Sequence, residues 1–362
     1  MKKTIPFKLL AALFPVFMTS QALSWGGRGH DTICETAAFL VEEPGLKAFL
    51  KSRSHTMGHL CNLPDIQWRS IADANVKASG DPTHYVEPDI LGLKPTQTST
   101  DIKKLQLEWT GKNRVDEPNK KIFQLTREMG SLWWRVDQFM RLKSQLKEGF
   151  AKSQPPANKQ EEQNDQLPFN QNTYQFMVYA GLMGHFVGDA SMPYHNTINY
   201  DGYKNGHGGI HAYYEEQSVS ENGIELQNKV YQAAKKFKST PWKNSKLSTI
   251  EKLQIFSEEA LADLKEVEKR DPIIKKSEVK SENGMNLRTP AERKDAQVGA
   301  KIFEPLIIKQ MAKSSALLAH LWDEAYRSVG KPELSKYKSY RYPLTADFIF
   351  PDYEETPAKS AK

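Results

Sequence analysis

The stretch HFVGDASMPYHNTINYDGYKNGHGGIHAYYE, residues 185–215, carries two spaced pairs of metal-binding side chains. His185 and Asp189 stand four residues apart, as do His211 and Glu215, and His195 lies between the two pairs. Residues four apart in an α-helix lie on one face, so each pair would direct an imidazole and a carboxylate to one point. Zinc accepts both kinds of ligand at about 2.0–2.2 Å. The stretch therefore predicts more than one metal ion on a helical scaffold.

The rest of the chain is patterned mostly for helices. A nearly continuous apolar run over 174–190 predicts a central buried helix. Apolar residues recur at helical spacing in further segments, with an interruption at Pro44 and a kink at Pro305: 32–51, 121–146, 224–237, 250–268 and 291–329. Strand alternation is scarce, and 89–118 and 270–290 look irregular. We expect an all-α fold, formed by a single multi-helix domain.

The N-terminal residues have the pattern of a signal peptide. Two lysines precede an apolar run over 9–18, and a small-x-small cleavage pattern follows at 22–24. The apolar run is too short for a permanent membrane span. We expect residues 1–24 to be removed, which would make Trp25 the mature N-terminus. The expected protein is secreted or periplasmic, with no transmembrane span in the mature chain.

The mature chain is expected to have two parts. Residues 25–330 would form the catalytic domain, with a solvated loop at 150–167 that is rich in Pro, Gln, Asn and Glu. Residues 331–362 would form an irregular C-terminal tail rich in Tyr, Pro and Lys. The whole sequence has a net charge of +6, and removal of the signal peptide with its lysines lowers this value. The remaining charge gives little indication of a polyanionic partner. We expect a monomer.

The two cysteines, Cys34 and Cys61, allow two interpretations. In an oxidising compartment they would form a disulfide, which is the interpretation that the export signal favours. Alternatively, Cys34 stands four residues after His30 and could form a zinc-binding pair with it. Cys61 precedes Asp65 by four residues, so a disulfide would join two segments of the expected site.

Five of the nine histidines occur in motifs that can be joined into one site. The motifs are WGGRGH from Trp25 to His30, NLPDIQWR with Asp65, HYVEPD beginning at His84, and the 185–215 stretch. In this order they resemble the zinc-dependent phospholipase C and single-strand-specific nuclease superfamily. The resemblance covers residues 25–217, and the C-terminal third contributes no motif.

The resemblance implies an all-helical fold with three zinc ions. The implied ligands form three sets, with Asp189 bridging the first two: Trp25, through its free amino group and carbonyl oxygen, with His30; Asp65, His84, His185 and Asp189; and His195, His211 and Glu215. Each ion would keep positions open for water and substrate, as catalytic zinc does. A water acidified by the metals would attack a phosphodiester in line. Asp65 is the candidate catalytic residue that orients this water or takes its proton.

Plainer interpretations exist for most of these residues. A histidine in an apolar helix such as His185 is often a packed core residue, and His211 with Glu215 could be a solvated i,i+4 pair. Asp73 and Asp81 compete with Asp65 as the carboxylate ligand. The remaining histidines we place outside the site: His55 and His59 in a turn before Cys61, His207 in a glycine-rich loop, and His320 on the last helix.

The resemblance is divided over the substrate. The five-residue step from Trp25 to His30 is typical of the nuclease branch, whereas Glu215 and the modest loop before His211 are typical of the phospholipase branch. Phospholipase C enzymes hold choline with an acidic residue three positions after the N-terminal Trp. Here that position is Arg28, which would repel choline and suit a phosphate or an acidic headgroup.

We therefore expect an exported zinc-dependent phosphodiesterase, a phospholipase C that acts on phospholipid headgroups in transient contact with a membrane surface. A single-strand-preferring nuclease or nucleotidase acting on nucleic acid is the alternative. A third interpretation is a non-catalytic binding module in which zinc only joins helices. Structural zinc sites are usually closed and rich in Cys, so a site of His and carboxylates favours catalysis.

Overall fold

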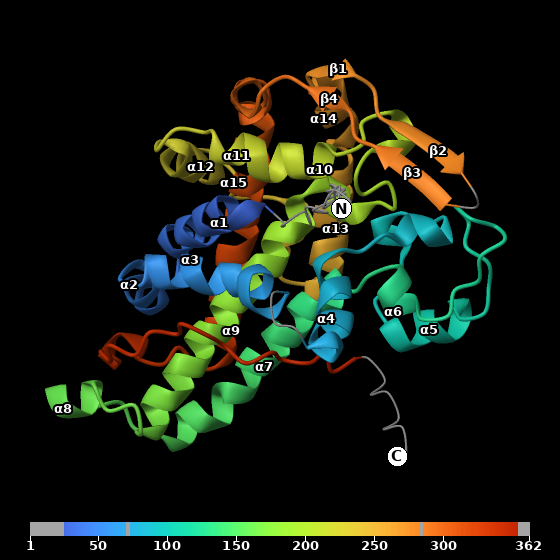
Figure 1. Cartoon of the computed structure of the whole chain (residues 1–362). Helices are drawn as coiled ribbons and strands as arrows, with labels where there is room; N and C mark the ends of the chain where they lie inside the picture. The colour runs from blue at the N-terminus through green and yellow to red at the C-terminus, as the bar shows by residue number, and fades with distance from the viewer. Residues whose placement is uncertain (1–24, 70–72, 283–284, 354–362) are drawn as a thin grey trace, which may run out of the picture.

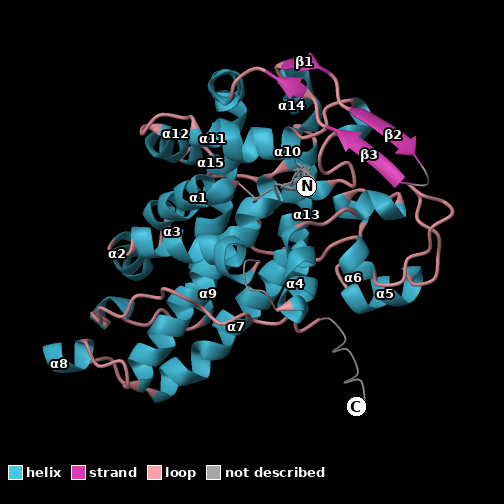
Figure 2. Ribbon diagram, in the orientation of Figure 1, coloured by secondary structure: helices cyan, strands magenta, loops and turns pink. Residues whose placement is uncertain are grey.

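The computed structural model describes residues 25–69, 73–282 and 285–353. The expected signal peptide, residues 1–24, lies outside the described residues. The described chain is mostly helical, as Figure 2 shows, which confirms the expected all-α class. Among the described residues, no helix combines the length and apolar character that crossing a membrane requires.

Helix α9 (Pro168–Ser191) is the centre of the fold. It begins at Pro168, whose fixed φ and missing N–H suit the first position of a helix. Its second half is almost completely buried, as the apolar run over 174–190 predicts. Four longer helices pack around it (Figure 1): α1 (Gly26–Leu40), α3 (Ser54–Leu63), α7 (Leu132–Lys152) and α15 (Ala296–Ser328).

Shorter helices complete the body. They are α2 (Pro44–Lys51), α4 (Ala74–Gly80), α5 (Ile102–Trp109), α6 (Leu125–Glu128), α8 (Lys159–Glu162), α10 (Ile210–Ala212), α11 (Ser218–Ser220), α12 (Leu226–Ala234), α13 (Thr249–Leu261) and α14 (Leu264–Arg270). The expected interruption at Pro44 is confirmed, because α2 begins there. Pro305, in contrast, lies inside the continuous helix α15. The segment 250–268, expected as one helix, is divided into α13 and α14.

The segment 270–290, expected to be irregular, contains strands instead. β1 (Ile273–Lys275) pairs antiparallel with β4 (Glu292–Arg293), and β2 (Glu278–Glu282) pairs antiparallel with β3 (Met285–Thr289). These two-stranded sheets project from one side of the helical body (Figure 2). Most of their described residues are exposed, so neither face carries the apolar alternation by which a strand is recognised in a sequence.

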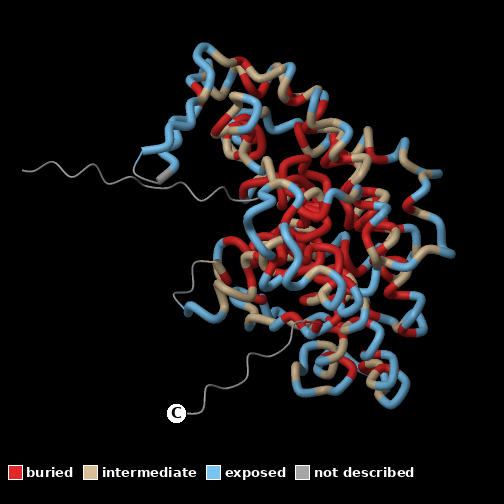
Figure 3. Tube along the Cα trace, turned by 90° about the vertical axis from the view of Figure 1, so that its right-hand side faces the viewer, coloured by how far each residue is buried: buried red, intermediate tan, exposed pale blue. Residues whose placement is uncertain are grey.

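The buried residues gather in the middle of the molecule (Figure 3), and the second half of α9 is part of this core. Large aromatic side chains fill it, including Trp133, Phe139, Phe186 and Trp322. The indole Nε1–H of Trp322 donates to the carbonyl oxygen of Ala180 at 3.0 Å, so even this buried polar group has its partner. The core therefore fixes α9, and with it any ligand that α9 carries.

The expected solvated loop and the expected irregular tail differ in their packing. Residues 150–152 form the end of α7, and the loop that follows, to residue 167, is mostly exposed and contains the short helix α8. The tail beyond Lys331 has little regular structure, but it lies against the body, and Leu334, Tyr337 and Tyr353 are buried. We call residues 342–353 the C-terminal strap. Residues 354–362 lie outside the described part.

Candidate metal centre

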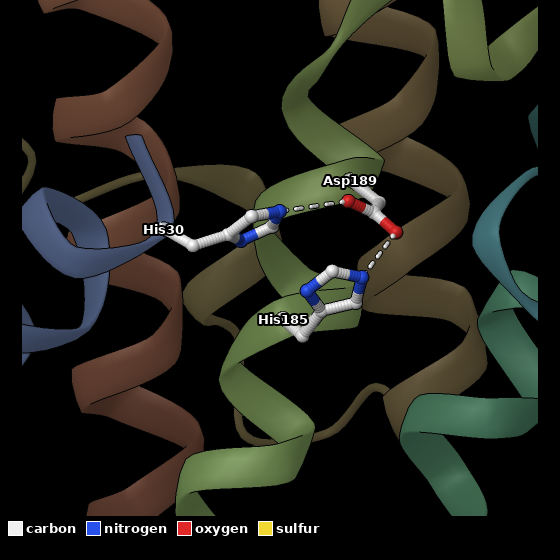
Figure 4. A group of neighbouring side chains, drawn as sticks. All are labelled: His30, His185 and Asp189. Carbon is white, nitrogen blue, oxygen red and sulfur yellow. Dashed lines mark ion pairs between the residues drawn. The ribbon is translucent and has the colours of Figure 1, made fainter. Parts of the chain in front are cut away.

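His185 and Asp189 lie one turn apart on α9, and both are fully buried. His185 Nε2 is 3.4 Å from Asp189 Oδ2, and His30 Nε2 of α1 is 3.5 Å from Asp189 Oδ1. Figure 4 shows the two histidines approaching different oxygens of this carboxylate. His30, His185 and Asp189 form the first of three groups whose ligand atoms lie within 4.8 Å of one another. A carboxylate in this position can bridge two ions.

The second group consists of Asp65, His84 and His185. His84 Nδ1 is 2.9 Å from His185 Nε2 and 3.1 Å from Asp189 Oδ2. Asp65 Oδ1 is 3.7 Å from each of the two histidine nitrogens. The four side chains of the second expected ligand set are therefore brought together, with Asp189 between this group and the first.

The third group consists of His195, His211 and Glu215, also buried. His211 Nε2 is 3.0 Å from His195 Nε2 and 2.9 Å from Glu215 Oε1, and His195 Nε2 is 3.6 Å from Glu215 Oε2. This is the third ligand set that the resemblance implies. The pair spacing within the 185–215 stretch thus identified residues that do converge.

Backbone carbonyls orient the rings toward these groups. Three histidines have Nδ1 at hydrogen-bond distance from a carbonyl oxygen: His185 from Cys61 (2.8 Å), His195 from His84 (2.5 Å) and His211 from Tyr200 (2.7 Å). A carbonyl oxygen only accepts, so in each ring Nδ1 carries the proton and donates it. The Nε2 lone pair of the neutral ring then points into the group, which is the usual arrangement of a metal-binding histidine.

The residues of these groups fit metal cations. In the third group, the Nε2 atoms of His195 and His211 face each other at 3.0 Å, which is repulsive unless a proton or a metal cation lies between them. Burial acts to lower the pKa of His211, but Glu215 outweighs burial and raises that pKa, so the metal-free group favours a positive charge at this position. Ligands of a tetrahedral zinc ion stand about 3.3 Å apart, close to the separations found here. Asp189 Oδ1 has no hydrogen-bond donor among the described residues, although it is completely buried. A buried charge of this kind needs a counter-ion.

The electrostatics of the metal-free protein support this fit. Burial raises the pKa of Asp189 well above its ordinary value and the pKa of Asp65 to about 7. Burial also lowers the pKa of His84 and His185, so these rings are neutral near pH 7. The centre therefore combines neutral imidazoles with carboxylates that burial disfavours as anions, and a divalent cation would stabilise them in the charged form.

Glu215 behaves differently from the other two carboxylates. Burial acts to raise its pKa, but the neighbouring His211 and His195 outweigh burial and hold the pKa at about 2. Glu215 is therefore already an anion in the metal-free protein. Its carboxylate offers the third group a permanent negative charge for a cation.

Short non-α turns carry most ligands outside α1 and α9. Asp65 lies in a π-helical turn, Pro64–Trp68, and His84 ends a 3-10 turn, Asp81–His84. Glu215 lies in a second π-helical turn, Tyr213–Gln217, because α10 ends at Ala212. The expectation that His211 and Glu215 share a regular α-helix is therefore wrong in detail, although they still lie one turn apart. π-helical turns are rare and are found frequently at functional sites.

Trp25 lies beside the third group. Its backbone nitrogen is 3.2 Å from Glu215 Oε2, and its buried indole Nε1–H donates to the carbonyl oxygen of Gly188 at 2.9 Å. Its carbonyl oxygen accepts from the N–H of Gly29 at 3.1 Å. A free amino group at Trp25 requires cleavage after residue 24, outside the described residues. Metal binding by Trp25 therefore stays a prediction.

The disulfide between Cys34 and Cys61 is confirmed. It joins α1 to α3, with the two Cα atoms 6.4 Å apart. The alternative, a zinc pair formed by His30 and Cys34, is wrong because the thiol is used in the bridge. The carbonyl oxygen of Cys61 also accepts from His185, so the bridge lies directly behind the metal centre.

The other histidines and acids have ordinary partners. His55 and His59 lie in helix α3 rather than in a turn, and His55 pairs with Glu35 at 2.7 Å. His207 pairs with Asp271 at 2.8 Å, and His320 lies 3.2 Å from Glu324. Asp73 caps the N-terminus of α4, and Asp81 lies 3.4 Å from Arg69. None of them belongs to the three groups, as expected.

A cleft of about 1130 Å³ opens onto the centre, and His84, His195 and His211 line it. Its walls contain the tyrosines Tyr85, Tyr194, Tyr200 and Tyr213 and the basic residues Arg69, Arg293 and Lys294. Arg69 Nη1 donates to Asp65 Oδ1 at 3.3 Å. Arg69 is not among the residues that we expected at the site, although its four-residue spacing from Asp65 is a signal that could have found it.

Arg28 does not face this cleft. Its guanidinium donates to the carbonyl oxygens of Ser220 at 2.8 Å and Gly223 at 2.6 Å, and Arg28 is absent from the described residues that line the cleft. The interpretation of Arg28 as a headgroup-selecting cation is therefore wrong. The spacing of Arg28 from Trp25 does not show the direction of the side chain, which α1 turns toward α11.

The structure thus brings eight of the nine expected ligands into three adjoining groups, with the ninth, Trp25, next to the third group. The second and third groups reach a cleft that is open to solvent through His84, His195 and His211, whereas no residue of the first group lines it. In comparisons with known proteins, the chain matches no family model and no curated protein sequence.

Proposed function

We propose that this protein is an exported zinc-dependent phosphodiesterase that acts as a phospholipase C on phospholipid headgroups. The observation that carries the proposal is the set of three adjoining, buried His/carboxylate groups, of which the second and third reach an open cleft through His84, His195 and His211. Structural zinc sites are closed, whereas catalytic sites leave a position open for water or substrate. The disulfide fits an oxidising compartment, which agrees with export.

The residues around the groups suit hydrolysis of a phosphodiester. Zinc, when bound, would acidify a water and neutralise charge on the phosphate oxygens. Asp65 Oδ1 lies 3.7 Å from the facing nitrogens of both His84 and His185, so its carboxylate can accept a proton from a water held at the second group. Arg69 lies between Asp65 and the cleft, where its guanidinium can orient a phosphate oxygen. We assign Asp65 the role of proton acceptor and Arg69 that of substrate positioning.

Two features bear on the substrate. Glu215 and the modest loop before His211 favour the phospholipase branch of the resemblance. The tyrosines of the cleft wall favour the second candidate, a single-strand-preferring nuclease or nucleotidase, because aromatic rings stack on bases. We give precedence to lipid and retain nucleic acid as the alternative.

One experiment separates the candidates. The purified mature protein, loaded with zinc, is given phospholipid vesicles and single-stranded nucleic acid in parallel, and the chelator-treated protein serves as the control. We expect diacylglycerol from the vesicles and no release of nucleotides. Nucleotides without diacylglycerol would overturn the lipid assignment. Activity that survives complete removal of metal would overturn the metalloenzyme proposal.

A metal count distinguishes both candidates from a binding module. We expect about three equivalents of zinc in the active protein. A single tightly held ion, with neither substrate hydrolysed, would indicate that zinc only joins helices.

A further inference from the structure

The C-terminal strap passes along the outside of the metal centre. In Figure 1 it is the red segment that crosses α9 and α7 and ends near α4. None of its described residues belongs to the three metal groups. It contacts α3 through His59 and α7 through Gln138 and Arg141. It also contacts or closely approaches the two short turns that carry Asp65 and His84, which are the π-helical turn Pro64–Trp68 and the 3-10 turn Asp81–His84.

Ala346 joins the strap to the turn that carries Asp65. The indole Nε1–H of Trp68 donates to the carbonyl oxygen of Ala346 at 2.8 Å. The backbone N–H of Ala346 in turn donates to Gln67 Oε1 at 3.1 Å. Two neighbouring residues of the turn are thus bonded to one residue of the strap, which fixes the position of the turn two to three residues after Asp65.

Phe348 contacts both turns. Its ring packs edge-on against Trp68, with the ring centroids 5.1 Å apart. On its other side it lies so close to Gly80 that a Cβ atom there would be 3.3 Å from the ring. Gly80 immediately precedes the turn that ends at His84. Phe348 therefore lies between the two turns that present ligands to the second metal group.

Arg135 extends this contact to α9. Its guanidinium lies 5.5 Å from the ring centroids of both Trp68 and Phe348, and 5.3 Å from that of Phe186. Phe186 follows His185 and packs against the His84 ring at 5.4 Å. The strap, the turns and α9 thus meet in one aromatic and cationic cluster behind the metal centre.

The end of the strap is anchored to α7. Arg141 forms a bidentate ion pair with Asp352, at 2.6 and 2.7 Å. The hydroxyl of Tyr353 is 3.1 Å from Ser131 Oγ, and the N–H of Ser131 donates to the carbonyl oxygen of Pro82 at 2.8 Å. Pro82 lies in the turn of His84, so this anchor also reaches that turn.

We propose that the C-terminal strap positions the second metal group, with Phe348 and Trp68 as positioning residues for Asp65 and His84. The inference rests on the proposed function, since it concerns the same site. A short turn has few backbone hydrogen bonds of its own, so contacts from elsewhere must set where its ligand lies. Groups that hydrogen-bond directly to a metal ligand change metal affinity about 10- to 100-fold when they are removed, so for contacts one residue further out we expect the lower end of this range.

The test measures zinc release from the full-length mature protein. A chelator titration with metal analysis is applied to wild type, to Phe348→Ala, and to Leu344→Ala as the matched control, because the Leu344 side chain is 71% exposed in the same strap. We expect Phe348→Ala to release one ion at a chelator concentration about 10-fold lower than wild type, while the third-group ion is released as in wild type. Leu344→Ala should match wild type.

Hydrogen exchange in the metal-free protein supplies a second readout. Peptides covering 64–69 and 80–86 should exchange faster in Phe348→Ala than in Leu344→Ala. Trp68→Phe keeps an aromatic ring but removes the donor to Ala346, and it should produce the same two effects at smaller size. It carries the test if Phe348→Ala does not fold.

Several results would overturn the inference. A Phe348→Ala protein with lower thermal stability but unchanged zinc release and exchange would show that the strap is only structural. Equal weakening of all three ions would show that it does not act on the second group. If wild type binds no zinc, the proposed function falls as well; if wild type binds three ions and the variants release all three as wild type does, only the strap inference falls.

Discussion

The ligands on helix α9 and the ligands on short turns are held in place by different means. His185 and Asp189 belong to a 24-residue helix whose backbone hydrogen bonds and buried faces fix them locally. Asp65 and His84 lie in turns of five and four residues. These turns depend on the strap, on α7 and on the disulfide-linked α3. Local sequence rules can therefore place the first kind of ligand, whereas only the tertiary structure places the second.

The largest loss of turnover should come from replacing a metal ligand that helix α9 carries. Asp189 faces His30 with one oxygen and His84 and His185 with the other, so Asp189→Asn removes charge from two metal groups at once. We expect turnover to fall about 1000-fold, since metal-ion stabilisation contributes several kcal/mol. The assay is phosphodiester hydrolysis at saturating zinc. Asp323 on the long helix α15 accepts from the backbone N–H groups of Glu42 and Glu43, which precede α2; Asp323→Asn is the control and should stay active. Near-wild-type turnover in Asp189→Asn would contradict its bridging role.

Removing the disulfide tests how far distant contacts support the turns. Cys34 and Cys61 are 27 residues apart in sequence, and closing a loop of this size is worth about 3.5 kcal/mol. The double substitution Cys34→Ala, Cys61→Ala should lower the free energy of unfolding by about that amount, measured by urea denaturation. Wild type treated with a reductant should show a similar loss. An unchanged unfolding free energy would show that α1 and α3 are held together without the bridge.

Asp65→Asn tests a metal ligand that a short turn carries. The amide keeps the shape but cannot take up a proton, and positioned acid–base groups contribute at least about 100-fold. We expect turnover to fall about 100-fold. The comparison variant is Asp81→Asn, whose carboxylate also lies near Arg69 but in none of the three groups. If Asp81→Asn were the more damaging of the two, the catalytic assignment would move to Asp81.

The smallest expected effect comes from comparing two arginines, one in the cleft and one away from it. Arg69 lines the cleft and bonds Asp65, whereas Arg28 bonds backbone carbonyls away from the cleft. Arg69→Gln should lower kcat/KM about 10-fold, the value of one charge-assisted hydrogen bond. Arg28→Gln should leave kcat/KM and headgroup preference as in wild type. A change of headgroup preference in Arg28→Gln would restore the role that the sequence first indicated for it.

The sequence predicted the locally determined parts of this molecule. The apolar run and the four-residue spacing of His185 and Asp189 located α9 and its ligands, because both signals arise within one helix. The pairing of Cys34 with Cys61 followed from composition and compartment. The choice of Asp65 over Asp73 and Asp81 came from the order of the motifs and agrees with the grouping that the structure shows.

The parts that the sequence missed depend on tertiary contacts. The strands after α14 are exposed on both faces, so they have no alternating pattern. The four-residue step from His211 to Glu215 does not show whether the chain between them is an α-helix or includes a π-helical turn. Arg28 was assigned to the wrong surface, because spacing along the chain does not show which way α1 faces. The sequence predicts only an irregular tail where the strap lies, because the strap is held in place by tertiary contacts with partners such as Trp68 and Arg135. Signal-peptide cleavage and the choice of substrate stay predictions.

The most direct test of the central claim is anomalous diffraction at the zinc absorption edge from crystals of the mature, zinc-loaded protein. We expect three peaks: one between His30 and Asp189, one among Asp65, His84 and His185, and one among His195, His211 and Glu215. A single peak, or peaks away from these residues, would contradict a three-metal phosphodiesterase centre.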